Sequence, residues 1–226
     1  MGPFLLLPCV VPALTVGIFG AHGGLGRELV KQSRERAHVP VAFVRRPSEH
    51  IYPPVRQGWL DPSEPRTPVP PFRNLTVRST ESVDGASLAD LDAAVFVMSG
   101  RPFVDDTSTG VVRRACAALP EGCSRVCLVF AWGVGGSIAS ANVGIKVMRG
   151  GHLRSVYRAK ETQEELVREW EGACPKRAAL VLRPKVLSYA PIPFNPFATP
   201  RNVLTFRILD WVEKPMSASS RPTSPA

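Results

Sequence analysis

The chain has 226 residues, of which 44% are hydrophobic and 21% charged, and its formal net charge is +9. This length and apolar content suffice for one buried core and leave little room for a large second domain. The positive charge favours anionic ligands, but the arginines are scattered and no nucleic-acid-binding motif is present. We therefore do not expect a nucleic-acid-binding protein.

Residues 1–13 are apolar and contain three prolines. They resemble the hydrophobic part of a signal peptide but lack its basic start. We interpret them as an N-terminal arm that precedes the folded domain, and a cleaved or anchoring signal is the alternative. A membrane span is not expected, because prolines interrupt the segment and a glycine-rich turn follows it too soon.

Residues 14–19 are an apolar run typical of a buried strand, and they lead directly into a turn with the pattern Gly20-x-x-Gly23-x-x-Gly26. A helical pattern begins within this turn. Glycines at such a junction let the backbone approach a diphosphate, whose charge lies against the free N–H groups at the helix start. The alternative is a strand-to-helix turn without a ligand. The predicted cofactor contacts of the turn are Gly20, Ala21, His22, Gly23, Gly24, Leu25 and Gly26. The His22 side chain either contacts phosphate or substrate, or points to solvent.

A second strand is predicted over residues 39–44, and Arg45 and Arg46 follow it. In folds that bind NAD, an acidic residue at this place accepts a hydrogen bond from the ribose 2′-hydroxyl. Two guanidinium groups instead suit the 2′-phosphate of NADP, so we predict NADP in preference to NAD. The alternatives are that the arginines are merely solvated, or that Glu49 binds the ribose.

The remaining pattern alternates strands with helices. Strands are predicted at residues 75–78, 93–98, 125–130 and 178–183, and helices at 85–91, 107–119 and 155–171. Thr107 or Ser108 is the predicted N-cap of the second of these helices. This alternation predicts an α/β fold, a Rossmann-like, doubly wound parallel sheet in three α/β/α layers, with the ligand at the carboxyl ends of the strands. We expect the domain to span residues 14–212, with a proline-rich loop at 47–73 and a disordered Ser/Pro tail at 213–226.

The chain has five cysteines, an odd number, and none is spaced as C-x-x-C. No histidine cluster accompanies them, so no metal site is expected. We predict buried free thiols, which indicate a reducing compartment and hence a cytoplasmic protein. The cysteines are Cys9, Cys116, Cys123, Cys127 and Cys174.

With these elements placed, the chain resembles the atypical branch of the short-chain dehydrogenase/reductase family, the NAD(P)H-binding proteins that include the biliverdin (flavin) reductase type and the NmrA-like sensors. The resemblance rests on the glycine turn, Val44-Arg-Arg-Pro47, residues 92–100, Tyr157-Arg-Ala-Lys160 and Leu182-Arg-Pro184. It implies that Met98, Ser99 and Gly100 line the adenine and ribose side of the cofactor, and that residues 184–187 pass near the nicotinamide. The family's adenine-contacting aspartate after the third strand is absent here, where Arg78-Ser-Thr80 stands.

Reductases of the wider family use a serine, a tyrosine, and a lysine four positions after the tyrosine; the tyrosine protonates the carbonyl that receives hydride. Here Phe130 or Ala131 replaces the serine, with Ser137 as a more distant substitute. Lys160 follows Tyr157 by three positions instead of four. Tyr157 and Lys160 are the candidate catalytic residues, and Lys160 is also a candidate cofactor contact. We place both at the border of an apolar helix stripe, and a surface ion pair of Lys160 with Glu164 is the alternative.

These observations predict an NAD(P)H-binding oxidoreductase whose small-molecule substrate is unknown. The loss of the serine and the shifted lysine favour an alternative, a redox sensor or interaction module that binds the cofactor without turnover. A sugar-nucleotide epimerase ranks last, because it needs a larger C-terminal substrate region than this chain offers.

Overall fold

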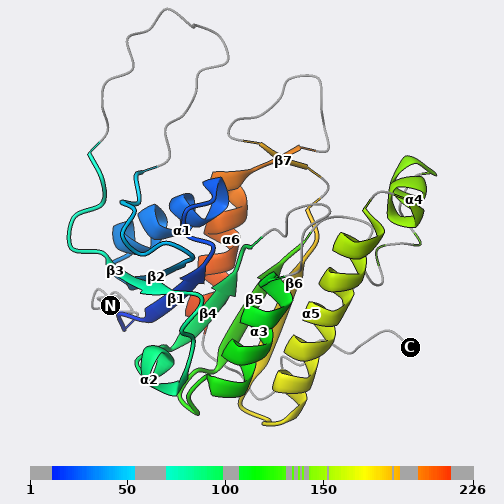
Figure 1. The fold of residues 1–226 in the computed structure, drawn as a ribbon. Coiled ribbons are helices and arrows are strands. Elements are labelled where there is room, and N and C mark those ends of the chain that lie inside the picture. The colour runs from blue at the N-terminus through cyan, green and yellow to red at the C-terminus, as the bar shows by residue number, and fades with distance from the viewer. Residues whose placement is uncertain are drawn as a thin grey trace, which may run out of the picture.

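Six parallel strands form one sheet between two layers of helices in the computed structural model of the chain (Figure 1). The structure describes residues 12–53, 70–98, 107–130, 134, 137, 139, 143–151, 153–184, 186–188 and 198–214. The sheet order is β3-β2-β1-β4-β5-β6. The strands are β1 (Thr15–Phe19), β2 (Val39–Val44), β3 (Thr76–Ser79), β4 (Ala93–Phe96), β5 (Arg125–Val129) and β6 (Ala178–Leu182). The predicted α/β fold and its doubly wound parallel sheet are therefore confirmed.

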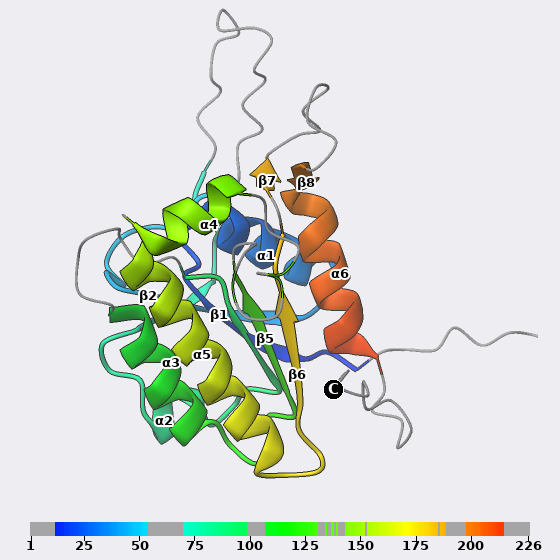
Figure 2. The ribbon, with the colours of Figure 1, turned by 90° about the vertical axis from the view of Figure 1, so that its right-hand side faces the viewer.

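The helices divide between the two faces of the sheet (Figure 2). Helices α2, α3 and α5 cover one face, and α1 and α6 pack together on the other. The helices are α1 (Gly24–Glu35), α2 (Gly85–Leu88), α3 (Thr107–Ala118), α4 (Val143–Gly150), α5 (Arg154–Gly172) and α6 (Arg201–Glu213). Among the described residues, a separate small sheet pairs β7 (Val186–Ser188) with β8 (Ala198–Pro200).

The apolar core lies on both faces of the sheet, as expected when parallel strands are covered by helices on both sides. On the α3 and α5 face, the ring of Phe19 stacks on those of Phe43 and Phe96, with centroids 4.2 and 4.5 Å apart. On the other face, Leu29 of α1 and Leu209 of α6 are fully buried. The sheet edge at which the strands end thereby lies between two packed helix layers.

Helix α1 ends in a Schellman motif. The N–H of His38 donates to the Ser33 carbonyl at 2.9 Å, and that of Ala37 donates to the Arg34 carbonyl at 3.0 Å. This motif needs a left-handed residue after the helix, and Ala37 supplies it with a φ of 61°. An alanine in a position that glycine normally occupies carries a small strain.

A charged cluster fastens the C-terminal helix to the end of α1. Arg36 donates to Asp210 at 3.0 Å and to Glu213 at 2.8 Å, and its guanidinium lies over the Phe206 ring. The buried His38 Nε2 lies 2.9 Å from the same Glu213 carboxylate. Burial acts to raise the Glu213 pKa, but the hydrogen bonds from Arg36 and His38 outweigh it and leave that pKa below its usual value.

The predicted strands all form, with ends that differ by at most two residues. The N-cap prediction was wrong, because Thr107 and Ser108 both lie inside α3. Outside the described residues are residues 1–11 of the predicted arm, 54–69 of the predicted loop and 215–226 of the predicted tail.

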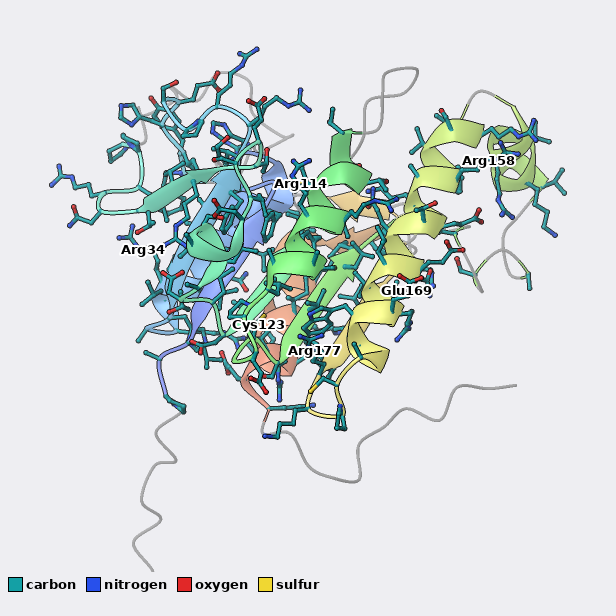
Figure 3. All side chains as sticks on the ribbon, turned by 60° about the horizontal axis from the view of Figure 1, so that its bottom comes forward. Arg34, Arg114, Cys123, Arg158, Glu169 and Arg177 are labelled. Carbon is teal, nitrogen blue, oxygen red and sulfur yellow. The ribbon has the colours of Figure 1, made fainter. Side chains whose placement is uncertain are left out.

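The described cysteines carry free thiols; Cys123 and Cys127 are buried, as predicted, whereas Cys116 and Cys174 are only partly buried. Figure 3 shows Cys123 and Arg177 near one another, at the end of the sheet where β5 and β6 begin. Burial raises the pKa of Cys116 and of Cys123 to about 12. Cys9 lies outside the described residues. Within the described ranges, no helix is both long and apolar enough to cross a membrane, and no cluster of side chains could hold a metal ion.

Candidate functional site

The glycine turn after β1 packs against the end of β4. Gly20 has a φ of +91°, and a Cβ placed on it would lie 3.2 Å from the backbone nitrogen of Met98. A Cβ on Gly26 would lie 2.4 Å from the Gly20 carbonyl oxygen and 2.7 Å from the Ala21 Cα. The first glycine therefore supplies a left-handed turn, and the third lets α1 approach the end of β1 closely.

The start of α1 is open to an anion. Its N-cap, Gly23, makes no side-chain cap, and the first turn has no acidic residue. The Gly23 N–H itself donates to the Gly20 carbonyl at 2.9 Å, which closes the turn. Since the next N–H groups of the helix have no intrahelical acceptors, a phosphate is a fitting partner for them.

A cleft of about 710 Å³ opens beside this turn, over the edge at which β1, β2, β3 and β4 end. Its volume lies within the range usual for small-molecule and cofactor sites. It is lined by Gly20, His22, Gly23, Phe43, Val44, Arg45, Arg46, Glu49, Thr80, Glu81, Val97, Met98, Thr107, Ser108, Gly110, Val111 and Arg114. Three of these residues are arginines, so the cleft suits an anionic ligand.

The two arginines after β2 differ in their surroundings. The Arg45 guanidinium donates to the Thr107 hydroxyl of α3 at 3.3 Å. The Arg46 side chain is 74% exposed and donates to Glu49 at 3.1 Å. Glu49 also lies 3.8 Å from His22 Nδ1. Because Glu49 partly neutralises Arg46, Arg45 is the better placed of the two to meet a second phosphate.

His22 is placed between solvent and the turn. Its side chain is 36% exposed and contributes to the cleft, while its Nε2 atom is buried without a hydrogen-bond partner. The His22 side chain therefore lies partly in solvent and partly in the cleft, so neither of the two predicted alternatives is decided by its position.

Sequence reasoning missed the lining that β3 and α3 contribute. Thr80 and Glu81 follow β3, and Arg114 of α3 donates to the Thr80 carbonyl at 3.0 Å. Arg78 is not among the residues that line the cleft, and it is paired with Asp90. The signal that could have found Thr80 and Glu81 is their place after a parallel strand, where ligands of such sheets gather.

The predicted adenine and ribose contacts fall on the end of β4. Met98 lines the cleft. Ser99 and Gly100 lie outside the described residues. The segment predicted to pass near the nicotinamide, residues 184–187, is described except for residue 185, and β7 begins within it.

Tyr157 and Lys160 do not lie at the border of the α5 stripe, as the sequence predicted, but within its buried face. Tyr157 is 6% exposed and Lys160 is 7% exposed. Burial raises the Tyr157 pKa above its usual value, although nearby Arg149 opposes this. The surface ion pair predicted as an alternative is wrong too, because Lys160 is buried and Glu164 accepts a hydrogen bond from Arg183.

Phe130 is one of the two residues that could replace the family's serine. It is buried, and its ring centroid lies 5.4 Å from the Lys160 Nζ. The substitute Ser137 donates its hydroxyl to the Val134 carbonyl at 2.8 Å.

Lys160 reaches the back of the cleft wall. Its Nζ donates to the Met98 carbonyl at 2.7 Å and to the Gln163 Oε1 at 3.0 Å. The Gln163 amide donates in turn to Ser108 at 2.8 Å and to Thr109 at 3.0 Å. Exposed side chains such as Arg158 and Glu169 occupy other faces of α5 (Figure 3).

The strand order and the glycine-lined cleft define a Rossmann-type dinucleotide-binding protein. Residues 20–191 match the model of a family described as NAD(P)H-binding, and the chain belongs to that family. The predicted membership of the atypical short-chain dehydrogenase/reductase branch is thereby confirmed. A search among curated proteins found no match.

Solved structures share the fold at low sequence identity. ChuY, an anaerobillin reductase from Escherichia coli O157:H7, is 18% identical with a TM-score of 0.61, over 89% of this chain and 91% of that one. The Bordetella bronchiseptica enzyme WbmH in complex with NAD+ is 15% identical with a TM-score of 0.57, over 89% and 73%. UDP-N-acetylglucosamine 4-epimerase from Bacillus cereus is 13% identical with a TM-score of 0.51, over 78% and 57%.

Proposed function

We propose that the chain is an oxidoreductase that binds NADP(H) in preference to NAD(H) in the cleft beside the glycine turn. The observation that carries the proposal is the convergence of the uncapped start of α1 and the Arg45 guanidinium on one cleft. The glycine turn from Gly20 to Gly26 would hold the diphosphate with backbone N–H groups. Arg45 would bind the 2′-phosphate, with Met98 beside the ribose; Ser99 and Gly100 keep that role as a prediction.

A bound nicotinamide cofactor would supply the hydride, and the protein would orient it. The catalytic role of Tyr157 and Lys160 stays a prediction, and the burial of both side chains supports chemistry that does not depend on them. A raised pKa also makes the Tyr157 hydroxyl a weaker acid. We therefore propose flavins, quinones and similar conjugated compounds as acceptors, because water can protonate their reduced forms. The reductase activity named for ChuY is in keeping with this class.

A titration of NADPH against NADH tests the cofactor preference, with Arg45→Ala and Arg46→Ala as the paired variants. Loss of a charge-assisted contact to a phosphate costs about 1.5–3 kcal/mol, so Arg45→Ala should weaken NADPH binding about ten- to hundredfold and leave NADH binding unchanged. Arg46→Ala should have the smaller effect, since Glu49 already engages Arg46. Equal affinity of the unaltered protein for both cofactors would contradict the proposed preference.

The Glu49→Gln variant separates the two roles that the sequence left open for this residue. If Glu49 only neutralises Arg46, its loss should strengthen NADPH binding, because one negative charge leaves the cleft. If Glu49 instead accepts a hydrogen bond from the ribose of NADH, the same change should weaken NADH binding. We expect the first result.

The second candidate function is cofactor binding without turnover. The observation that favours it is Phe130, a buried aromatic side chain near the position where the family's reductases carry a serine. Incubation with NADPH and a panel of flavins, quinones and aldehydes separates the two functions. Steady oxidation of NADPH would refute the sensor, and binding of NADPH without reduction of any panel member would refute the reductase.

We also propose a cytoplasmic location. The free thiols of Cys116, Cys123, Cys127 and Cys174 support a reducing compartment. Localisation of the full chain with a C-terminal tag would test this, and secretion into an oxidising compartment would contradict it.

A further inference from the structure

Lys160 and Gln163 form the centre of a buried polar brace behind the cleft, defined here as Met98, Lys160, Gln163, Ser108 and Thr109. It joins three elements: the end of β4, the first turn of α3, and α5. Gln163 is 1% exposed, Ser108 is 6% exposed and Lys160 is 7% exposed. Buried polar groups at this depth are costly unless they are hydrogen-bonded to one another, so the brace specifies one arrangement of these elements.

The hydrogen bonds fix the direction of the brace. A lysine ammonium can only donate, so the group of Gln163 that faces Lys160 is the carbonyl oxygen. The two amide hydrogens of Gln163 are then left for the hydroxyls of Ser108 and Thr109. The Thr109 hydroxyl lies 3.3 Å from the Ala159 carbonyl of α5 and donates to it. Each of these hydrogen bonds thus joins a group that can donate to a group that can accept.

The brace touches the cleft at two points. Met98, whose carbonyl accepts from Lys160, lines the cleft, and so does Ser108, whose hydroxyl accepts from Gln163. These residues stand at the two ends of segment 99–106, one at the end of β4 and the other at the start of α3. Both residues are therefore part of the cleft wall, and Met98 also packs against Gly20 of the glycine turn.

We infer that Lys160 and Gln163 are positioning residues, which hold Met98 and the first turn of α3 in the geometry that the cofactor requires. This inference rests on the proposed function, since it presupposes that NADP(H) binds in the cleft. It assigns Lys160 to the wall of the cofactor site instead of to proton transfer, and it gives Gln163 a role that no sequence motif indicated.

The test compares Gln163→Leu, Lys160→Met and the double variant with the unaltered protein and with Lys31→Met, a control at a partly exposed lysine on α1 that pairs with Glu35. Each single brace variant should raise the Kd for NADPH about tenfold, the effect of losing buried hydrogen bonds from one network. The double variant should be far less than additive, because both changes break the same connection. At saturating NADPH, the pH dependence of hydride transfer to a flavin should keep its shape in these variants, because the brace holds the cleft wall and transfers no proton.

The outcomes separate the alternatives. If the unaltered protein binds no NADPH, the proposed function fails, whatever the brace does. If it binds NADPH and Gln163→Leu binds equally well, the positioning role is wrong. A changed pH profile in Lys160→Met alone would show proton transfer by Lys160 and would overturn the inference. Should Gln163→Leu fail to fold, Ser108→Ala decides in its place by the same NADPH titration, because it removes the acceptor of the Gln163 hydrogen bond and little volume.

Discussion

Substitution of the third glycine of the turn tests whether close backbone approach shapes the site. In Gly26→Ala, the added methyl group would lie 2.4 Å from the Gly20 carbonyl oxygen and 2.7 Å from the Ala21 Cα. Both neighbours are backbone atoms of the turn, so no flexible side chain can move aside. Either α1 must move away from β1, or the turn must open.

Two opposed energies set the size of the effect. Alanine in place of glycine within a helix stabilises it by up to about 1 kcal/mol. Overpacking of a tight contact costs typically about 1–3 kcal/mol. Gly172, the last residue of α5, offers a matched control, because an added Cβ there meets nothing within 4 Å. The Gly172→Ala variant should therefore show only the stabilising effect of alanine in a helix. This effect should be smaller than in mid-helix, because Gly172 is the last residue of α5.

Urea unfolding at pH 7 measures the difference between the two variants. We expect Gly26→Ala to be less stable than Gly172→Ala by about 1–3 kcal/mol, which is the cost of the contact alone. The displaced Gly20 carbonyl should also weaken NADPH binding by tenfold or more, while Gly172→Ala binds as the unaltered protein does. If Gly26→Ala matched its control in both stability and NADPH affinity, the account of the turn would be refuted.

Three further predictions concern the fold. Ala37→Gly should stabilise the chain by about 0.5–1 kcal/mol in urea unfolding, because Ala37 occupies a left-handed position with a φ of 61°; a loss of stability would contradict the assigned motif. Glu213 has a pKa below its usual 4.5, so its carboxylate should stabilise α6 fully above that pH and progressively less as the pH falls through the lower folded value. The stability difference between the unaltered protein and Glu213→Gln should therefore shrink on acidification, and a difference that is constant from pH 7 to pH 3 would refute the coupling. Finally, Cys123 and Cys127 should resist alkylation by iodoacetamide at pH 8 until the chain unfolds, since burial raises the pKa of both thiols, and mass spectrometry of the native protein would detect any early reaction.

The sequence predicted most accurately what the local backbone determines. The second strand was placed at the residues where β2 forms, and the glycine spacing identified the turn, because both depend on a short run of neighbouring residues. The small sheet of β7 and β8 and the helices α4 and α6 were not predicted. The two strands are only three residues long, α4 has only eight residues, and the hydrophobic periodicity of α6 is weak.

The sequence failed where polar side chains are buried. Counting Tyr157 and Lys160 as border residues assumed that a lysine avoids the interior of a helix packing face. The structure places both in that interior, because Met98 and Gln163 satisfy the ammonium group there. Such partners lie far apart in the chain, 62 residues in the case of Met98, so no local pattern could reveal them.

The first turn of α3 contributes one residue to each of the two proposals, so the two can be tested separately. Thr107 accepts a hydrogen bond from Arg45 across the cleft, and the adjacent Ser108 accepts one from Gln163 behind it. If Arg45 binds the 2′-phosphate as proposed, its loss should weaken NADPH binding and spare NADH binding. Loss of Gln163 moves the wall that both cofactors share, so it should weaken both by a similar factor. If Gln163→Leu changed the ratio of the two affinities as strongly as Arg45→Ala does, position and charge could not be separate determinants of cofactor binding in this cleft.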